Sequence, residues 1–299
     1  MRQPDSGTST SFPYRLGTVS WKLVLFVGLF IALYLPFVLP FLLYPQTEYV
    51  VLATASARVT IELIAATCVI LAAMAMTRYV DRMPLRTLGL AWRRCAGFVC
   101  GGTVLGGGLL LAALVILIIS GCVKPGPGHG PFTHEFVWTL AAMLLNTIGQ
   151  EVLVHGYVQQ VVRREFGAAA GVIVAAFVLV LLHYTLFHTD ALLLLVNLFI
   201  AGLILGMAFL WSRSLWLPIG IHFGWNYVQG PVLGLPVTTI DLWPSDLVVL
   251  NGNPLLTGGT MGIEGGLVAS IVLIAATAAF YYILRRNRAA QLELEVVIQ

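Results

Sequence analysis

Charged side chains are scarce in this sequence. Asp, Glu, Lys and Arg make up 10% of its 299 residues, whereas 59% of the residues are hydrophobic. Because soluble globular domains carry about 25% charged residues, the composition argues against an ordinary soluble domain. It indicates instead a polytopic membrane protein.

Cysteine is scarce as well, and its spacing does not suggest a metal site. The four cysteines, Cys68, Cys95, Cys100 and Cys122, contain no C-x-x-C pair, so we expect them to be small packing residues. The sequence shows no nucleotide-binding loop and no internal repeat. No signal peptide is expected, because the first 20 residues are polar and no short apolar core with a small-residue cleavage site follows them.

Long hydrophobic runs dominate the rest of the chain. A helix needs about 20 apolar residues to cross a bilayer, and eight runs come close to this length or exceed it. They lie at about 21–45, 49–77, 97–121, 134–164, 168–187, 191–211, 214–230 and 262–284. The sequence therefore predicts an all-α polytopic membrane protein with about eight transmembrane helices. In the run 97–121, Gly102 and Gly106 are four residues apart, which lets helix backbones approach closely in lipid.

The basic residues support this count. If the N-terminus is cytoplasmic, all of the 16 Lys and Arg residues except Arg58 and Lys124 fall on the cytoplasmic side. We therefore expect both termini to be cytoplasmic, in a membrane that is most simply a prokaryotic cytoplasmic membrane. The basic clusters are interpreted as topology determinants, so membrane lipids and no nucleic acid are expected as partners.

The runs divide the chain into five parts. We expect a cytoplasmic tail, three N-terminal transmembrane helices, a core of four helices, a long outer loop, and a last helix with a short tail. Their predicted ranges are 1–20, 21–132, 133–230, 231–261 and 262–299.

Ionisable and polar side chains interrupt three of the core helices. Glu151 and His155 are four residues apart on one helix face, and His222 and Asn226 repeat that spacing on a later helix. His183 lies on the helix between them. At about 1.5 Å per residue from the flanking arginines, Glu151, His183 and His222 lie roughly 14 to 22 Å deep. Ionisable residues at this depth indicate a functional site.

This set of side chains suits the hydrolysis of an amide. A carboxylate and an imidazole can hold and deprotonate a water molecule, which we expect of Glu151 and His183. His222 and Asn226 can donate hydrogen bonds to the oxyanion that forms when a carbonyl is attacked. The alternative is structural: Glu151 pairs with His155, and the other histidines only bridge helices.

Residues 146–230 resemble the CAAX prenyl endopeptidase and bacteriocin-processing family of intramembrane proteases, also called CPBP or Abi. The family motifs are E-E-x-x-x-R, F-x-x-x-H and H-x-x-x-N or D. Their counterparts are Q-E-V-L-V-H at 150–155, L-V-L-L-H at 179–183 and H-F-G-W-N at 222–226. The resemblance implies a CAAX-protease-like helix bundle and a glutamate-dependent peptidase that requires no metal or other cofactor.

Besides Leu179 in place of the motif's phenylalanine, two departures from the family pattern bear on the chemistry. Gln150 replaces the first glutamate, which is thought to activate the water, and His155 replaces the arginine. An amide cannot accept a proton, so Gln150 cannot be a general base. Either Glu151 or a neutral His183 has taken that role, or the protein no longer cleaves.

The sequence leaves several functions open. The first is an intramembrane endopeptidase acting on a hydrophobic or lipidated peptide, with prenylated peptides and bacteriocin precursors as candidate substrates. The second is a pseudoprotease that binds such peptides, for example as an immunity protein. The third is a zinc-dependent variant, because Glu151, His155, His183 and His222 are suitable ligand types. Transport is a weaker alternative, since no paired inverted halves are visible.

Overall fold

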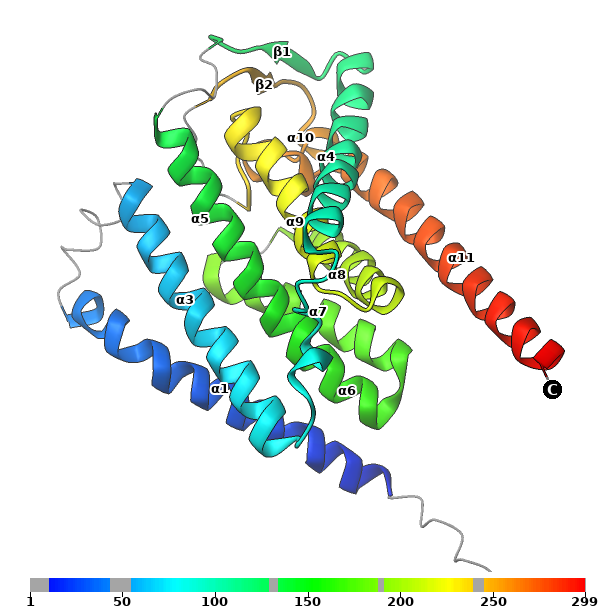
Figure 1. Ribbon diagram of the computed structural model, residues 1–299. Coiled ribbons are helices and arrows are strands. Elements are labelled where there is room, and N and C mark those ends of the chain that lie inside the picture. Colours follow the sequence, from blue (N-terminus) through cyan, green and yellow to red (C-terminus); the bar gives the residue numbers. More distant parts are fainter. Residues whose placement is uncertain (1–10, 44–54, 129–133, 188–190, 239–244, 299) are drawn as a thin grey trace, which may run out of the picture.

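The computed structural model describes residues 11–43, 55–128, 134–187, 191–238 and 245–298, and these residues form a helical bundle (Figure 1). The long helices are α1 (Phe12–Leu43), α3 (Ala55–Ala75), α4 (Cys95–Ile119), α5 (His134–Glu151), α6 (Gln159–Phe166), α7 (Ala168–Phe187), α8 (Leu192–Ser212), α9 (Trp216–Tyr227) and α11 (Leu267–Ile298). Among the described residues, seven helical stretches are long and apolar enough to cross a membrane. The prediction of an all-α polytopic membrane protein is confirmed.

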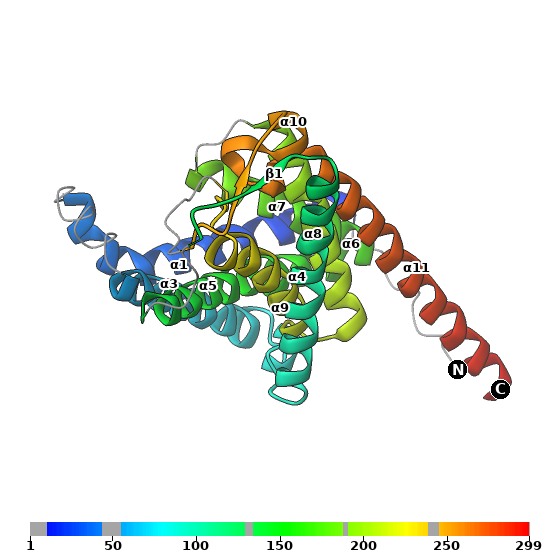
Figure 2. The same cartoon turned by 90° about the horizontal axis from the view of Figure 1, so that it is seen from above.

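Two helices differ from the predicted runs. The first helix starts at Phe12, within the expected tail, because the polar residues before Trp21 are compatible with a helix. Residues 1–10 of that tail lie outside the described residues. The helix expected at 214–230 is α9, which has 12 residues and continues into the π-helical turn η4 (Val228–Val232). It is shorter than the seven candidate spans, yet it lies among them in both views (Figures 1 and 2).

Large apolar side chains are exposed on the outer helices. Val24 and Phe37 of α1 and Ile119 of α4 are examples, and only 6% of the apolar window of α1 is buried inside the protein. Such exposure would be unfavourable in water but is expected where the surrounding medium is lipid. The C-terminal part of α11 extends away from the other helices in both views (Figures 1 and 2).

Glycine allows α4 and α9 to pack backbone against backbone. A Cβ atom on Gly102 would lie 2.5 Å from the carbonyl oxygen of Leu217, and one on Gly106 would clash with the carbonyl of Ile221. On α9, Gly220 and Gly224 lie equally close to the backbone of α4. The predicted role of Gly102 and Gly106 is therefore confirmed. This contact fixes α9, the helix that carries His222 and Asn226.

The outer connection between α9 and α11 has more structure than a loop. Its strand β2 (Val248–Leu250) pairs antiparallel with β1 (Val123–Pro125), and short helical turns follow: α10 (Pro254–Thr257), η5 (Gly259–Met261) and η6 (Ile263–Gly265). Residues 239–244 of this connection lie outside the described residues. Asn197 of α8 attaches the connection to the bundle, because its amide donates to the carbonyl oxygens of Glu264 (2.8 Å) and Gly266 (3.0 Å).

The glycine contact predicts different effects for two alanine substitutions in α4. Gly106→Ala should lower the stability by about 1–3 kcal/mol, the usual cost of overpacking, because the new methyl group meets the α9 backbone. Gly108→Ala is the matched control, since a Cβ there has no neighbour within 4 Å. Thermal unfolding in detergent measures both. Equal melting temperatures for Gly106→Ala and Gly108→Ala would contradict the close contact.

Candidate active site

A π-helical segment positions the first motif. After Glu151, which ends α5, residues Val152–Val158 form the π-helix η3 before α6 begins. Insertions of this kind widen one helical turn and are frequent at functional sites. Glu151 and His155 both have no exposed surface, so the polar pair is enclosed by protein and does not face lipid.

Glu151 pairs with a histidine of another helix. Its Oε1 lies 2.8 Å from Nδ1 of His222 on α9. A carboxylate only accepts hydrogen bonds, so Nδ1 of His222 carries the proton and donates it. Nε2, on the opposite side of the ring, is then the atom that can act on a substrate. This resembles the way in which a buried carboxylate orients a catalytic imidazole.

His155 is oriented by Gln159 and faces the same carboxylate. The amide of Gln159 donates to the carbonyl oxygen of Gly206 (3.1 Å), so its Oε1 accepts from Nδ1 of His155 (2.7 Å). Nε2 of His155 then points to Oε2 of Glu151 at 3.9 Å, which is too long for a direct hydrogen bond. Neither atom has a hydrogen-bond partner among the described residues.

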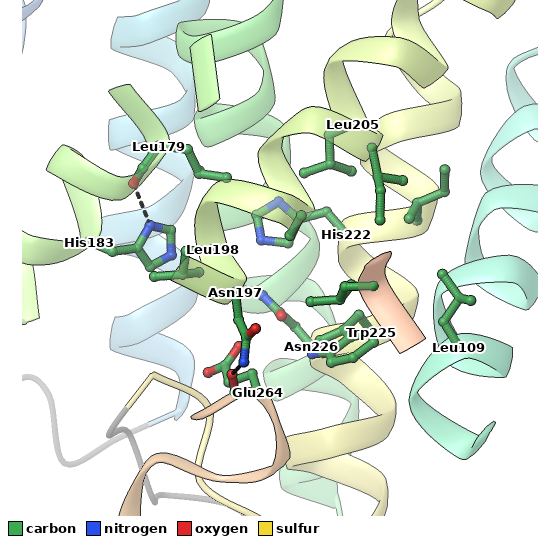
Figure 3. Close-up of a pocket in the computed structure, with 14 residues that line it drawn as sticks. Leu109, Leu179, His183, Asn197, Leu198, Leu205, His222, Trp225, Asn226 and Glu264 are labelled. Atoms are coloured by element: carbon green, nitrogen blue, oxygen red, sulfur yellow. Dashed lines mark hydrogen bonds between the residues drawn. The ribbon is translucent and has the colours of Figure 1, made fainter. Parts of the chain in front are cut away.

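His183 of α7 has a defined tautomer. Its Nδ1 lies 2.9 Å from the carbonyl oxygen of Leu179, one helical turn earlier (Figure 3). A carbonyl oxygen cannot donate, so Nδ1 carries the proton. In a neutral imidazole, Nε2 is then a hydrogen-bond acceptor.

A single pocket brings three of the four predicted site residues together. His183, His222 and Asn226 line it (Figure 3), and its empty space is about 580 Å³ when the part open to solvent is included. Glu151 is not among the lining residues, but its carboxylate is hydrogen-bonded to His222, which is one of them. The pocket is lined by Leu109, Leu179, His183, Asn197, Leu198, Ala201, Ile204, Leu205, Ile221, His222, Trp225, Asn226, Glu264 and Leu273.

Gln150, the other residue of the first motif, lies elsewhere. Its amide donates to Oδ1 of Asn146 (2.7 Å), and Asn146 donates to Oε2 of Glu62 on α3 (3.1 Å). This chain of side chains joins α5 to α3. Gln150 does not line the pocket.

Two polar residues of the pocket were not predicted from the sequence. Asn197 is a single buried amide in an otherwise apolar stretch of α8, a signal that could have been noticed. Glu264 lies in a glycine-rich stretch far from the motifs, and nothing in its local sequence pointed to the site. Its side chain accepts hydrogen bonds from the backbone amide and the hydroxyl of Thr238.

Glu264 is buried just outside the membrane-spanning part of α11. Burial raises the pKa of Glu264 to about 7, although the hydrogen bonds from Thr238 and the nearby His222 lower it. A carboxyl group with such a pKa can exchange a proton near neutral pH.

The geometry does not favour the zinc-dependent alternative. Within the described part of the chain, no group of three or more His, Cys, Asp and Glu side chains is arranged so that it could hold a metal ion. Glu151, His155 and His222 lie near one another: Oε1 of Glu151 is 2.8 Å from Nδ1 of His222, and Oε2 is 3.9 Å from Nε2 of His155.

The fold and the site define a class of protein. An enclosed acid–histidine pair beside a pocket with two histidines, inside a bundle of membrane-spanning helices, marks a functional site within a membrane protein. Residues 132–228 match the family model described as type II CAAX prenyl endopeptidase Rce1-like. The resemblance to the CAAX protease family is thereby confirmed, and the chain carries an Rce1-like domain. A search of curated proteins and a search of solved structures each found no match.

The position of Gln150 predicts the effect of restoring the family's glutamate. Gln150→Glu should not raise any peptidase activity, because the new carboxylate would lie beside Asn146 and not in the pocket. It should cost about 1–3 kcal/mol of stability, since it removes a donor and adds a charge near Glu62. Cleavage rates and melting temperatures measure this, with Gln150→Met as the uncharged control. A gain in cleavage rate would contradict the assignment.

Proposed function

We propose that the protein is an intramembrane endopeptidase that hydrolyses a peptide bond of a membrane-associated, hydrophobic or lipidated substrate. The observation that carries the proposal is the pocket in which His183, His222 and Asn226 converge, with Glu151 directly behind His222. The Rce1-like match supports the same reaction class, because that family consists of peptidases.

Each residue has a role that follows from its contacts. Nε2 of His183 accepts a hydrogen bond from the attacking water and orients it, since Nδ1 is held by Leu179. The Nε2 edge of His222 and the amide of Asn226 donate to the oxyanion of the tetrahedral intermediate. Glu151 acts as a positioning residue, because it holds the ring of His222 through Nδ1. His155 lies where the family has an arginine and completes the polar surroundings of Glu151.

The lining of the pocket supports an apolar substrate. Nine of its 14 lining residues are apolar, and they come from α4, α7, α8, α9 and α11. Burial of apolar groups from a lipid chain or a hydrophobic peptide segment against them is favourable. Of the five polar lining residues, Asn197 bonds the outer connection and Ser270. The other four carry groups that can meet a peptide bond.

Cleavage by site variants tests this proposal. We expect wild-type protein in liposomes to cleave members of a quenched lipidated-peptide library. Glu151→Gln should lower kcat by about 10²-fold, because the negative charge that holds His222 is lost. His183→Ala should lower it by about 10²–10⁴-fold. Thr185→Ala, an exposed position on the same helix as His183, is the control and should cleave like wild type. Unchanged rates in both site variants would refute the proposed mechanism.

One observation favours a second candidate function. The position of the family's first glutamate carries an amide that faces α3, so the usual carboxylate is missing from the pocket. A pseudoprotease would bind hydrophobic peptides in the same pocket without cutting them. Tight binding of library peptides by a wild-type protein that never cleaves them would establish this alternative.

We also propose that both termini are cytoplasmic, on the basis of the distribution of basic residues. Arg82 and Lys124 are both exposed, and Arg82 precedes α4 in the chain whereas Lys124 follows it. In a cysteine-free background, Arg82→Cys in sealed cells should be protected from an impermeant maleimide, whereas Lys124→Cys should be labelled. Labelling in the opposite pattern would reverse the orientation.

A further inference from the structure

Glu264 is the one carboxyl group among the residues that line the pocket. It lies in η6, outside the stretch that matches the Rce1-like family, and reaches the pocket from the outer connection (Figure 3). His183, His222 and Asn226 face the same space from α7 and α9. The pocket therefore combines the histidines of the family motifs with an acid from a different part of the chain.

We propose that Glu264 is the general base of this pocket, the group that takes the proton from the attacking water. The proposal rests on the peptidase function above and deepens it, because it names the group that replaces the carboxylate missing at Gln150. Neither of the two motif positions can supply that carboxylate. Gln150 is an amide that faces α3, and Glu151 is enclosed behind His222.

The backbone of Glu264 is hydrogen-bonded to a residue of the pocket. The amide of Asn197, itself a pocket residue, donates to the carbonyl oxygens of Glu264 and Gly266, and its Oδ1 accepts from the hydroxyl of Ser270 (2.7 Å). Gly262, just before η6, has a φ of 73°, a conformation that favours glycine. These contacts hold η6 against α8 and α11, and none of them involves the side chain of Glu264.

Among the described residues, only one of the two carboxylate oxygens of Glu264 accepts hydrogen bonds. Both of its hydrogen bonds among the described residues come from Thr238 and end on Oε1. Oε2 therefore keeps its lone pairs for another donor. A carboxylate anchored through one oxygen, with the other available to the pocket, is suited to hold and deprotonate a water molecule.

Peptide hydrolysis by Glu264, His222 and Asn226 accounts for every proton and electron pair. The oxygen of the water forms a bond to the carbonyl carbon, and the proton of the water passes to Glu264. The carbonyl π electrons move to the oxygen, which His222 and Asn226 stabilise. When the intermediate collapses, the C–N bond breaks and Glu264 returns the proton to the leaving nitrogen. The products are a carboxylic acid and an amine, and no metal or redox partner takes part.

The charged surroundings of Glu264 are compatible with this role. The titratable groups that line the pocket with it are His183 on α7 and His222 on α9, while Asn197 of α8 and Thr238 are uncharged. The pKa of Glu264 is raised to about 7 by burial. The base must be ionised to act, so the rate should rise with pH through about 7 and be lost below it.

Isosteric substitution tests the role of Glu264 in the full-length protein in liposomes. Glu264→Gln keeps the size of the side chain and an oxygen that accepts from Thr238, so its melting temperature should stay close to that of wild type. We expect kcat to fall by about 10²–10⁴-fold, with KM nearly unchanged. Glu264→Asp retains a carboxylate and should recover part of the activity. Glu165→Gln, a partly buried glutamate on α6, is the matched control and should cleave like wild type.

The pH profile separates a base from a structural group. The kcat of wild type should fall as the pH drops below about 7. The residual kcat of Glu264→Gln should not show this fall. A Glu264→Gln variant that is folded and cleaves at the wild-type rate would overturn the role of Glu264 and leave the peptidase function intact. Wild-type protein that binds the peptides but never cleaves them would overturn both. If Glu264→Gln fails to fold, Glu264→Asp and the wild-type pH profile become the test. A wild-type kcat that does not fall below about pH 7 would then refute the proposal.

Discussion

A carboxylate enclosed in a membrane protein must find its partners inside the protein. At bilayer depth, an unpaired charge costs about 3 kcal/mol or more, and Glu151 has no exposed surface at all. His222 on α9 meets one of its oxygens, and His155 faces the other. The π-helical turn after Glu151, the Gln159 side chain that orients His155, and the position of α9 are all arranged around this pair.

The helix that brings His222 to Glu151 is itself held by glycine. α9 has only 12 residues, and it lies against α4 with backbone contacts that a methyl group at Gly106 or Gly224 would break. In lipid there is little hydrophobic drive between helices, so such close contacts are a main source of helix association. The packing of four glycines and the chemistry of one ion pair therefore depend on each other. A shift of α9 along α4 would separate His222 from Glu151.

The pocket is lined by residues from two separate parts of the sequence. The Rce1-like domain supplies both histidines and Asn226, whereas the outer connection supplies Glu264. Asn197 connects the two, since it lines the pocket and also binds the backbone of the connection. Gln150 stands where the family has its first glutamate and faces α3, whereas the pocket contains a carboxyl group from Glu264.

Much of the fold could be predicted from the sequence. Runs of about 20 apolar residues give the helices, and small residues four apart gave the contact of Gly102 and Gly106 with α9. The errors were local. The start of α1 at Phe12 was missed because a short polar stretch continues a helix as well as it ends one. The pairing of β1 with β2 could not be foreseen, because three-residue strands carry no recognisable period and their partners are more than 120 residues apart in the chain.

For the site, the sequence determined which residue types are present in the motifs and predicted that they lie deep in the membrane region. Helical periodicity was enough to place Glu151 with His155, and His222 with Asn226, on shared faces. Which side chains meet across helices depends on helix rotation and packing, and these are properties of the whole bundle. Only the tertiary structure decided that Glu151 lies behind His222 and outside the pocket, that Gln150 faces α3, and that Glu264 enters from the outer connection.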